Sequence, residues 1–455
     1  MAFSAIFMLS IMFEVQTVNL VSANGIPAPP ISHIYIRSNG TIEPLTAPIL
    51  PDGPIYTLTK DIPNSSIIVQ CDNIVIDGAG YGIHGYSTSS HDGIIISYRT
   101  NVTIKNMDIS PFGYGVRMDY ASNNTIIGNK MRAFTGVSLL YSDCNQIIEN
   151  VITDGYGVQG LGSNNLIIGN NFTSGLSGGG NGMGIYMTGS NNTISHNTII
   201  HEVSINLGPS AQYNTISFNT ILNGESGILI AKSSKNLIFG NIIKGKMDSR
   251  SGGLYLSYDS YDNTIFANQF ENNALAVSLG AQVATIVWNN VYNNTFYNNN
   301  FINNAQNVWI APGTPVNFWD NGKQGNYWSN FHGIDSNGDG LSETSYEITG
   351  NNTDRHPLMK PIDISTSILP STSTTPSPSS SPSQSTSPSS NPDPAPSPAV
   401  PEFETWIILP MFIIATVVLV VYFRKRKLQT TNAQSFASSK ISRIKHSKRG
   451  LCTQV

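Results

Sequence analysis

The chain has 455 residues, of which 11% are charged, and its formal net charge at neutral pH is −4. Typical soluble domains contain about 25% charged residues, so the composition disfavours large acid/base sites and charged metal cages. No basic stripe follows the sequence, and we expect no nucleic-acid partner. The three cysteines, Cys71, Cys144 and Cys452, form no CxxC pattern, which argues against a disulfide framework and indicates buried free thiols.

The N-terminal residues 1–23 are largely apolar and end in Val21-Ser-Ala23, small residues typical of a signal-peptidase site. The usual preceding positive charge is missing, because the first basic residue is Arg37. We predict a signal peptide over residues 1–23, with an uncleaved apolar N-terminus as the alternative. Residues 24–72 would then form a cap that covers the first strand edge of the fold.

Residues 73–316 contain a recurrent N-x-I-x-x-N-x-Φ motif, in which Φ is apolar. Its copies start roughly 20 to 30 residues apart, a spacing typical of stacked structural units. Short runs of alternating apolar residues stand before the motif, such as Gly136-Val-Ser-Leu139, and indicate β-strands. The clearest copies begin at Asn124, Asn145, Asn165, Asn192, Asn214, Asn236, Asn263 and Asn294.

Strands this short are unstable alone, but winding the chain lets each strand pair with its copy one turn away. We therefore predict an all-β, right-handed parallel β-helix. Isoleucines would stack inside, and the two asparagines of each motif would form ladders, because a carboxamide both donates and accepts hydrogen bonds. A leucine-rich repeat fits less well, since it needs more leucine and usually a helix per unit. Replacing Asn192 or Asn214 should cost on the order of 1–3 kcal/mol of stability.

The spacing between motif copies widens near Gly179, Ser249 and Gln282. In a solenoid such insertions form loops on one face, which is often the working face, although simple bulges would give the same spacing. Residues 317–361 are then rich in aromatic residues, including Trp319 and Trp328. We interpret this region as a C-terminal cap, and a sugar-stacking platform is the alternative.

Within that cap, Asp335-Ser-Asn-Gly-Asp-Gly-Leu-Ser-Glu343 resembles the first half of a calcium-binding EF-hand loop. Alternate positions supply oxygen ligands and Gly340 stands at the sharp turn. The twelfth position is Tyr346, so the usual bidentate glutamate is missing. The sequence favours Ca²⁺ and a loop without metal equally; the ligands would be Asp335, Asn337, Asp339, Leu341 and Glu343.

The C-terminal part has the layout of a membrane-anchored surface protein. Residues 362–400 are rich in Ser, Thr and Pro and predict an extended stalk. Residues 401–427 contain an uncharged stretch long enough to span a bilayer, closed by Arg424-Lys-Arg-Lys427. Positive charge stays on the cytoplasmic side, so the β-helix would be extracellular and residues 428–455 a cytoplasmic tail. We expect a single-pass protein of the cell membrane.

The motif repeats, together with Gly325-Asn-Tyr-Trp-Ser329, Asp335 to Gly340 and His356-Pro-Leu-Met359, resemble the NosD-type β-helix proteins. These are bacterial and archaeal surface or periplasmic proteins, often called periplasmic copper-binding proteins. The resemblance covers roughly residues 73–361 and implies a fold and an extracytoplasmic compartment more than an activity. The C-terminal span also resembles sorting signals of archaeal surface proteins, although the tail after it favours a retained anchor.

Two specific functions follow from such relatives. Copper delivery, known in the founding members, needs imidazole or sulfur ligands, and the candidates are His196, His201, Met183 and Met187, or the pair His84 and His91. No regular ladder of these residues exists, so we do not expect copper. Polysaccharide cleavage needs carboxylates gathered on one face. The acids share no motif position, and the candidate pairs are Asp119 with Arg117 and Asp248 with Arg250.

The remaining hypothesis is non-catalytic binding of glycan or other cell-envelope components by the exposed faces. The predicted stalk and anchor favour it, as does a surface rich in Asn, Ser and Tyr. We take this as the leading prediction, with a polysaccharide lyase or hydrolase and a copper-delivery protein as the alternatives. The motif itself is expected to be scaffold, and any specific function to lie outside it.

Overall fold

The computed structural model describes residues 32–86, 91–174, 182–245, 252–283, 286–349 and 351–364. The chain divides into two units, Met1–Thr372 and Ser373–Val455, and everything described lies in the first. The predicted signal peptide, the anchor, the tail and nearly all of the stalk fall outside the described residues. Among the residues described, no helix is both long and apolar enough to cross a bilayer.

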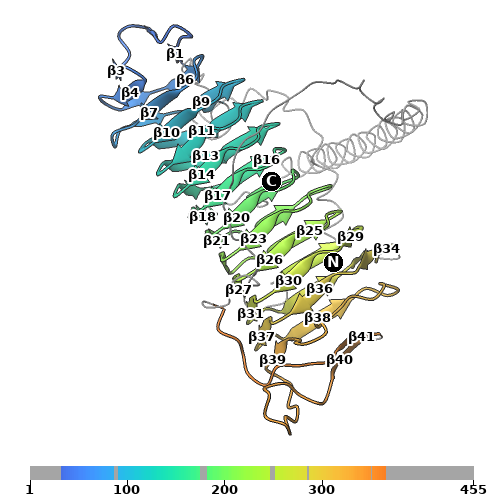
Figure 1. Ribbon diagram of the computed structural model, residues 1–455. Helices are drawn as coiled ribbons and strands as arrows, with labels where there is room; N and C mark the ends of the chain where they lie inside the picture. The colour runs from blue at the N-terminus through green and yellow to red at the C-terminus, as the bar shows by residue number, and fades with distance from the viewer. Residues whose placement is uncertain are drawn as a thin grey trace, which may run out of the picture. The chain divides into compact units, whose positions relative to one another are not determined.

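The described chain winds into a solenoid whose coils follow one another from the N-terminal to the C-terminal end (Figure 1). The first stack of strands contains the third position of each motif, which is isoleucine in every copy but the last, where it is Phe296. Its members are β3 (Ile49–Asp52), β4 (Ile55–Leu58), β7 (Ile74–Asp77), β10 (Val102–Lys105), β12 (Thr125–Ile127), β14 (Gln146–Ile148), β17 (Leu166–Ile168), β20 (Thr193–Ser195), β23 (Thr215–Ser217), β26 (Leu237–Phe239), β30 (Thr264–Phe266) and β36 (Thr295–Tyr297).

A second stack follows each motif after a corner. It comprises β5 (Ile62–Pro63), β8 (Gly82–His84), the first parts of β11 (Asp108–Asp119) and β13 (Lys130–Leu140), β15 (Val151–Thr153), β18 (Asn171–Thr173), β21 (Thr198–Ile200), β24 (Thr220–Leu222), β27 (Ile242–Lys244), β31 (Gln269–Glu271), β37 (Asn300–Ile302) and β39 (Tyr327–Trp328).

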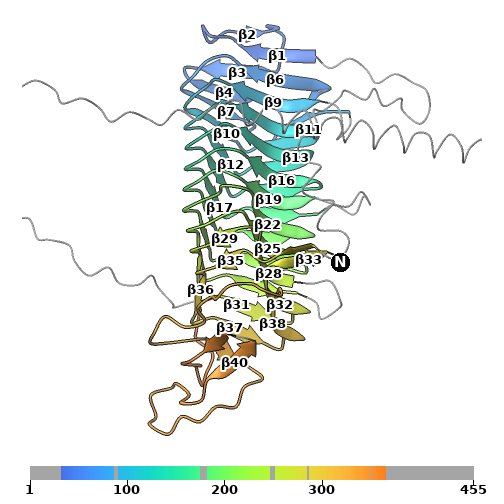
Figure 2. The ribbon, with the colours of Figure 1, turned by 90° about the vertical axis from the view of Figure 1, so that its right-hand side faces the viewer.

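The third stack completes each coil. It comprises β2 (Ile42–Glu43), β1 (Ser32–Ile36), β6 (Ser65–Val69), β9 (Asp92–Ser97), the second parts of β11 and β13, β16 (Tyr156–Gly160), β19 (Met183–Met187), β22 (Val203–Leu207), β25 (Ser226–Ala231), β28 (Gly252–Ser257), β32 (Leu275–Leu279) and β38 (Gln306–Ile310). β11 and β13 join the second and third stacks into one sheet, and the turned view in Figure 2 shows the stacking edge-on.

The register between coils confirms the predicted parallel β-helix. Ile126 pairs with Ile147, which pairs with Ile167, and that residue pairs with Ile194. All four side chains are fully buried, as the stacked-isoleucine prediction requires. Each coil thus covers the apolar face of its neighbour, and burial of this surface is the main driving force for the stack.

The two motif asparagines form the predicted ladders. In Asn124, the backbone N–H and Nδ2 both donate to Oδ1 of Asn145, at 2.9 and 3.1 Å, while Nδ2 also donates to the carbonyl of Arg99 at 3.2 Å. The pattern repeats along two buried rows. The first row is Asn124, Asn145, Asn165, Asn192, Asn214, Asn236, Asn263, Asn294 and Asn317; the second is Asn129, Asn150, Asn170, Asn197, Asn219, Asn241, Asn268, Asn299 and Asn326.

The residue before each asparagine of the second row, except Asn326, turns the corner between the first and second stacks with a positive φ. Three of these corners have glycine, Gly128, Gly169 and Gly240, for which the left-handed conformation carries no steric penalty. Other coils place His196, Phe218 or Ala267 in the same conformation. Residues of different size thus occupy this position, which lies outside the isoleucine core.

The N-terminal end, which we expected to be a cap, also carries parallel strands. β1 pairs in parallel with β6, and β6 in parallel with β9, so the third stack already begins at Ser32. Two antiparallel pairs, β1 with β2 and β3 with β4, add to this end. Such local reversals blunt an otherwise open sheet edge.

The C-terminal end is closed by stacked rings and by two polar residues. Trp319 lies against Phe296 and Trp328 against Phe301, with ring centroids 4.4 and 4.2 Å apart. Both tryptophans are 1% exposed, so their rings close the last coil, as the cap interpretation predicts, and are not available to stack on a sugar. The hairpin of β40 (Tyr346–Thr349) and β41 (Asn352–Asp354) packs beyond them.

β41 supplies the last acceptor of each ladder. Oδ1 of Asn352 accepts from the backbone of Asn317 and from Nε1 of Trp319, at 3.2 and 3.1 Å. Oδ2 of Asp354 accepts from the backbone of Asn326 and from Nε1 of Trp328, at 2.7 and 2.8 Å. The second ladder therefore ends on a buried carboxylate, whereas all of its earlier positions are carboxamides.

Of the three predicted insertions, those near Gly179 and Ser249 lie outside the described residues. The third contains an antiparallel pair, β33 (Ala281–Val283) with β34 (Ile286–Trp288). A short parallel pair, β29 (Ser260–Tyr261) with β35 (Val291–Tyr292), lies at a neighbouring corner. Cys71 and Cys144 are free, but Cys144 is exposed, so the expectation of a buried thiol is wrong there because its turn faces solvent.

Candidate functional site

Two carboxylates and one guanidinium meet on the outer surface of the third stack. Asp92 opens β9, and Arg117 and Asp119 lie near the end of β11, one coil further on. Nη1 of Arg117 is 3.3 Å from Oδ2 of Asp92, and Nε is 3.0 Å from Oδ2 of Asp119. We call these three residues the acid–arginine cluster.

Strand alternation and register place the cluster on the outside. Val116 and Met118 are fully buried, so Arg117 and Asp119 between and after them point outward. Parallel pairing sets Tyr114 beside Asp92 and Asp119 beside Ser97. The guanidinium can therefore reach a carboxylate on its own strand and another on the preceding coil.

The cluster is only partly open to solvent. The side chains of Asp92 and Asp119 are 17% and 16% exposed, whereas Arg117 is 42% exposed. Burial raises the pKa of Asp92, and the charge and hydrogen bond of Arg117 oppose that shift. Burial acts to lower the pKa of Arg117, but its two carboxylate partners raise it overall, so the cation is secured.

Aromatic rings flank the cluster on both sides. Tyr120, which directly follows Asp119, stacks between Tyr98 and Tyr141 at centroid distances of 5.2 and 5.3 Å. These three tyrosines turn the corner after the third stack and are 67%, 51% and 55% exposed, in chain order. On the other side Tyr114 lies with its ring centroid 6.0 Å from Cζ of Arg117.

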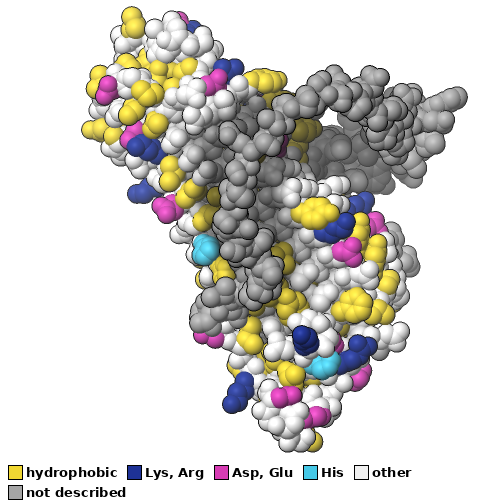
Figure 3. All heavy atoms as spheres, viewed as in Figure 1, with side chains coloured by type: hydrophobic (Ala, Val, Ile, Leu, Met, Phe, Trp, Pro, Cys, Tyr) yellow, Lys and Arg dark blue, Asp and Glu magenta, His cyan; other side chains and the backbone are white. Residues whose placement is uncertain are grey.

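This combination suits a hydroxylated, uncharged ligand. Carboxylates accept from hydroxyl groups and a guanidinium donates to them, while rings cover the apolar C–H faces of a sugar. The cluster carries one net negative charge, which disfavours a polyanion. On the face shown in Figure 3, charged side chains form small separate spots, and no continuous basic patch is seen on the described part of that face.

Only one of the two candidate carboxylate–arginine pairs lies within the described residues, and two other acidic residues of the coils make structural hydrogen bonds. Of the two candidate pairs, Arg117 and Asp119 are in contact, whereas Asp248 and Arg250 lie outside the described residues. Oδ1 of Asp143 accepts from the backbone of Ser163 at 2.6 Å, and Oδ1 of Asp259 accepts from Nδ2 of Asn290 at 2.5 Å. Each of these two carboxylates thus connects its own coil to the next one.

The predicted copper ligands point in different directions. Met187 is fully buried in the core, where it pairs with Leu207 of the next coil. His201 is also buried, and burial lowers its pKa. His196 instead turns a corner after the first stack, where its ring stacks on Phe218 at 5.2 Å. Among the described residues, no three His, Cys, Asp or Glu side chains are grouped so that they could hold a metal ion.

The predicted calcium loop is ordered by its own backbone. Asp335 accepts from the N–H groups of Gly338 and Gly340, at 2.7 and 3.0 Å, and Oδ1 of Asn337 accepts from Asp339 at 2.8 Å. The Glu343 carboxylate accepts from the backbone of Ser336 at 3.1 Å, which lowers its pKa. The carboxylates of Asp335, Asp339 and Glu343 thus accept from N–H groups of their own loop, and in this conformation they are not grouped around a metal position.

Sequence reasoning found two members of the acid–arginine cluster and missed Asp92. Asp92 and Arg117 are 25 residues apart, a distance within the spread of coil lengths. This spacing would have placed Asp92 and Arg117 on neighbouring coils. The coils before Asn124 do not follow the motif closely, however, so their register could not be assigned from the sequence.

Two family models match the solenoid. Residues 92–206 match the family described as "Right handed beta helix region", and residues 176–292 match "Periplasmic copper-binding protein (NosD)". The solenoid is a NosD-type right-handed β-helix. The predicted resemblance and handedness are thereby confirmed, and the two matched ranges overlap over residues 176–206, which include β19, β20 and β21.

Solved structures that are similar to part of the chain have low sequence identity and TM-scores below 0.5. The catalytic domain of an α-1,3-glucanase in complex with tetrasaccharides is 13% identical, with a TM-score of 0.46 over 60% of this chain and 59% of that one. An alginate lyase complexed with a trisaccharide is 16% identical, with a TM-score of 0.43 over 56% and 66%. The tailspike of E. coli bacteriophage HK620 with a pentasaccharide is 12% identical, with a TM-score of 0.40 over 68% and 60%. No curated protein sequence matches the chain.

Proposed function

We propose that the NosD-type solenoid binds a neutral glycan of the cell envelope through its acid–arginine cluster and the adjacent tyrosines, without cleaving it. The observation that carries this proposal is the contact of Arg117 with two carboxylates from successive coils, next to three exposed stacked tyrosines. In that setting the polar groups are fixed in place before a ligand arrives, which lowers the entropic cost of binding.

Polysaccharide cleavage is the alternative, and one observation favours it. The raised pKa of Asp92 would help it act as a proton donor, with Asp119 as the second carboxylate. Binding is the better proposal because both carboxylates are engaged by the same guanidinium. Release of new reducing or unsaturated ends from an envelope glycan would decide for the alternative.

The proposed location comes from the sequence. We propose a cell-surface protein in which residues 401–427 anchor the chain and the solenoid stands outside the membrane on its Ser/Thr/Pro-rich stalk. A glycan of the same envelope would then be the ligand within reach. Protease treatment of intact cells should remove the solenoid if this orientation is right.

Replacing Arg117 with glutamine is expected to weaken glycan binding by roughly tenfold to a hundredfold, the usual effect of losing hydrogen bonds made by a charged group. The full chain would first be screened on a glycan array, and the best neutral ligand then titrated calorimetrically. The Arg117 side chain is 42% exposed and points away from the core, so the fold should persist.

The matched control is Lys244→Gln, which breaks another coil-to-coil ion pair, with Glu271, on the second stack. Its affinity should equal that of the wild type. Equal affinity of the Arg117→Gln variant, or an array without any glycan signal, would rule out the proposed surface.

We also keep Ca²⁺ binding by the loop from Asp335 to Glu343 as a proposal, with Asp335, Asn337, Asp339, the carbonyl of Leu341 and Glu343 as ligands. Sites of this kind in extracellular modules bind at about 10⁻⁴ to 10⁻³ M. At about 10 mM Ca²⁺ the melting temperature should therefore rise by a few degrees. Asp335→Ala should abolish the rise, whereas Asp52→Ala, at the other end of the solenoid, should keep it. An unchanged wild-type melting temperature would dismiss the site.

A further inference from the structure

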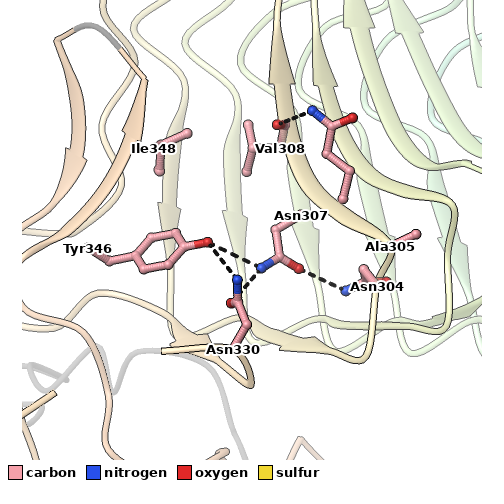
Figure 4. A pocket seen from close by; sticks show the side chains of 8 residues that line it. Asn304, Ala305, Asn307, Val308, Asn330, Tyr346 and Ile348 are labelled. Carbon is pink, nitrogen blue, oxygen red and sulfur yellow. Dashed lines mark hydrogen bonds between the residues drawn. The ribbon is translucent and has the colours of Figure 1, made fainter. Parts of the chain in front are cut away.

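A polar hollow lies between the last coil and the C-terminal hairpin, far along the solenoid from the acid–arginine cluster. Its volume is about 260 Å³, and β38 and β40 form opposite sides (Figure 4). The lining is Asn304, Ala305, Gln306, Asn307, Val308, Asn330, Tyr346 and Ile348, all uncharged. Nothing in the proposed function uses these residues.

Several polar groups that line the hollow make only long contacts with one another. The Tyr346 hydroxyl is 3.4 Å from Nδ2 of Asn307 and 3.4 Å from Nδ2 of Asn330. Asn304 Nδ2 lies 3.4 Å from Oδ1 of Asn307. These contacts are longer than the usual 2.7–3.2 Å of protein hydrogen bonds, so the groups can exchange one another for a ligand. Two bonds among the lining residues are of ordinary length: Nδ2 of Asn307 donates to Oδ1 of Asn330 at 3.0 Å, and Nε2 of Gln306 donates to the carbonyl of Val308 at 3.1 Å.

Contacts outside the hollow nevertheless fix two of its lining residues, Tyr346 and Asn304. The Tyr346 ring stacks on the buried Trp328 at 4.3 Å and meets the edge of Phe331 at 5.5 Å. Asn304 accepts from the backbone of Asn273 at 3.0 Å and donates to the carbonyl of Phe270 at 2.9 Å. The Tyr346 ring and the Asn304 side chain are thus fixed before a ligand binds, whereas the Tyr346 hydroxyl and Nδ2 of Asn330 make only the long contact to each other and, for the hydroxyl, to Asn307.

We propose that this hollow, which we call the amide pocket, binds a single uncharged sugar residue. Carboxamides and a phenol each donate and accept, which matches the hydroxyl groups of a pyranose. Val308, Ile348 and Ala305 offer apolar contact for its C–H groups. The lining contains neither a cation for an anionic ligand nor a carboxylate for a metal. The volume lies below the roughly 300–1,000 Å³ of pockets for drug-sized ligands, so one ring is the expected occupant.

The inference is independent of the acid–arginine cluster, since the two sites share no residue. The test titrates the full chain with methyl β-D-glucopyranoside, methyl α-D-mannopyranoside and methyl β-D-galactopyranoside, followed by saturation-transfer NMR. At least one glycoside should bind. Tyr346→Phe, which keeps the ring stacked on Trp328, and Asn330→Ala should each weaken it about threefold to tenfold, as expected for the loss of one or two hydrogen bonds.

Tyr327→Phe is the matched control, because it removes a phenol hydroxyl from the same cap outside the lining. That variant should bind like the wild type, as should Arg117→Gln. Binding that survives both pocket variants, or no binding of any glycoside, would overturn the proposal. Loss of glycoside binding in Arg117→Gln alone would assign the sugar to the acid–arginine cluster and would equally overturn it.

Discussion

Replacing Asn214 with alanine is expected to lower the free energy of unfolding by about 3 kcal/mol. Oδ1 of Asn214 accepts from the backbone and Nδ2 of Asn192, at 2.8 and 3.0 Å, and its own Nδ2 donates to Asn236 and to the carbonyl of Gly189. Alanine leaves these buried groups without a partner, and each such group costs about 1–3 kcal/mol. Guanidinium chloride titration of the full chain measures the loss.

Gln212→Ala is the matched control, since it removes a half-exposed amide two residues earlier that is not part of the ladder. Its stability should stay within about 0.5 kcal/mol of the wild type, as is usual for surface substitutions. An Asn214→Ala variant as stable as Gln212→Ala would show that the ladder does not hold the coils together.

The buried carboxyl of Asp354 is expected to make the solenoid more stable in mild acid than at neutral pH. Burial raises its pKa from 3.8 to about 6, against the opposing hydrogen bonds from Asn326, Trp328 and His356. The folded state therefore prefers the protonated form. Its contribution to stability is complete below about pH 4 and is lost as the pH rises through about 6. The shift corresponds to about 3 kcal/mol between those limits.

Asp354→Asn tests this directly, because all the remaining positions of the ladder are asparagine. The variant should keep the acceptor for Asn326 and Trp328 and lose the extra stability at low pH, measured as unfolding free energy between pH 4 and 7. Asp354→Ala should be less stable at every pH, since both donors are left buried and unpaired. A wild-type pH dependence in Asp354→Asn would locate the titrating group elsewhere.

The scaffold could be predicted from the sequence because one repeated motif determines both the buried residues and the hydrogen bonds of each turn. The side chains of a β-strand alternate between its two faces, so the isoleucine of each copy must point inward, and the carboxamide of each asparagine can both donate and accept in a buried turn. The stacked Ile126 and Ile147 and the ladder through Asn124 and Asn145 follow from these two facts. That the second ladder ends on Asp354 could not be predicted, because β41 lies outside the repeat. The position of β41 against the last coil depends on how Trp328 packs.

The candidate sites were less predictable because they depend on register between unlike coils. Arg117 and Asp119 are neighbours in the sequence, but Asp92 joins them only through the pairing of β9 with β11. The amide pocket similarly combines Asn307 of β38 with Asn330 and Tyr346, which are brought together by the cap. Sequence spacing outside the motif does not determine such contacts.

One paired measurement tests most directly whether the motif is scaffold and the outer surface is the site. The unfolding free energy and the affinity for the glycan selected on the array would be determined for Asn214→Ala and Arg117→Gln under conditions where both remain folded. Asn214→Ala should lose stability and keep its affinity, and Arg117→Gln should lose affinity and keep its stability. The account would be contradicted if Arg117→Gln bound the glycan like the wild type, or if Asn214→Ala lost binding without losing stability.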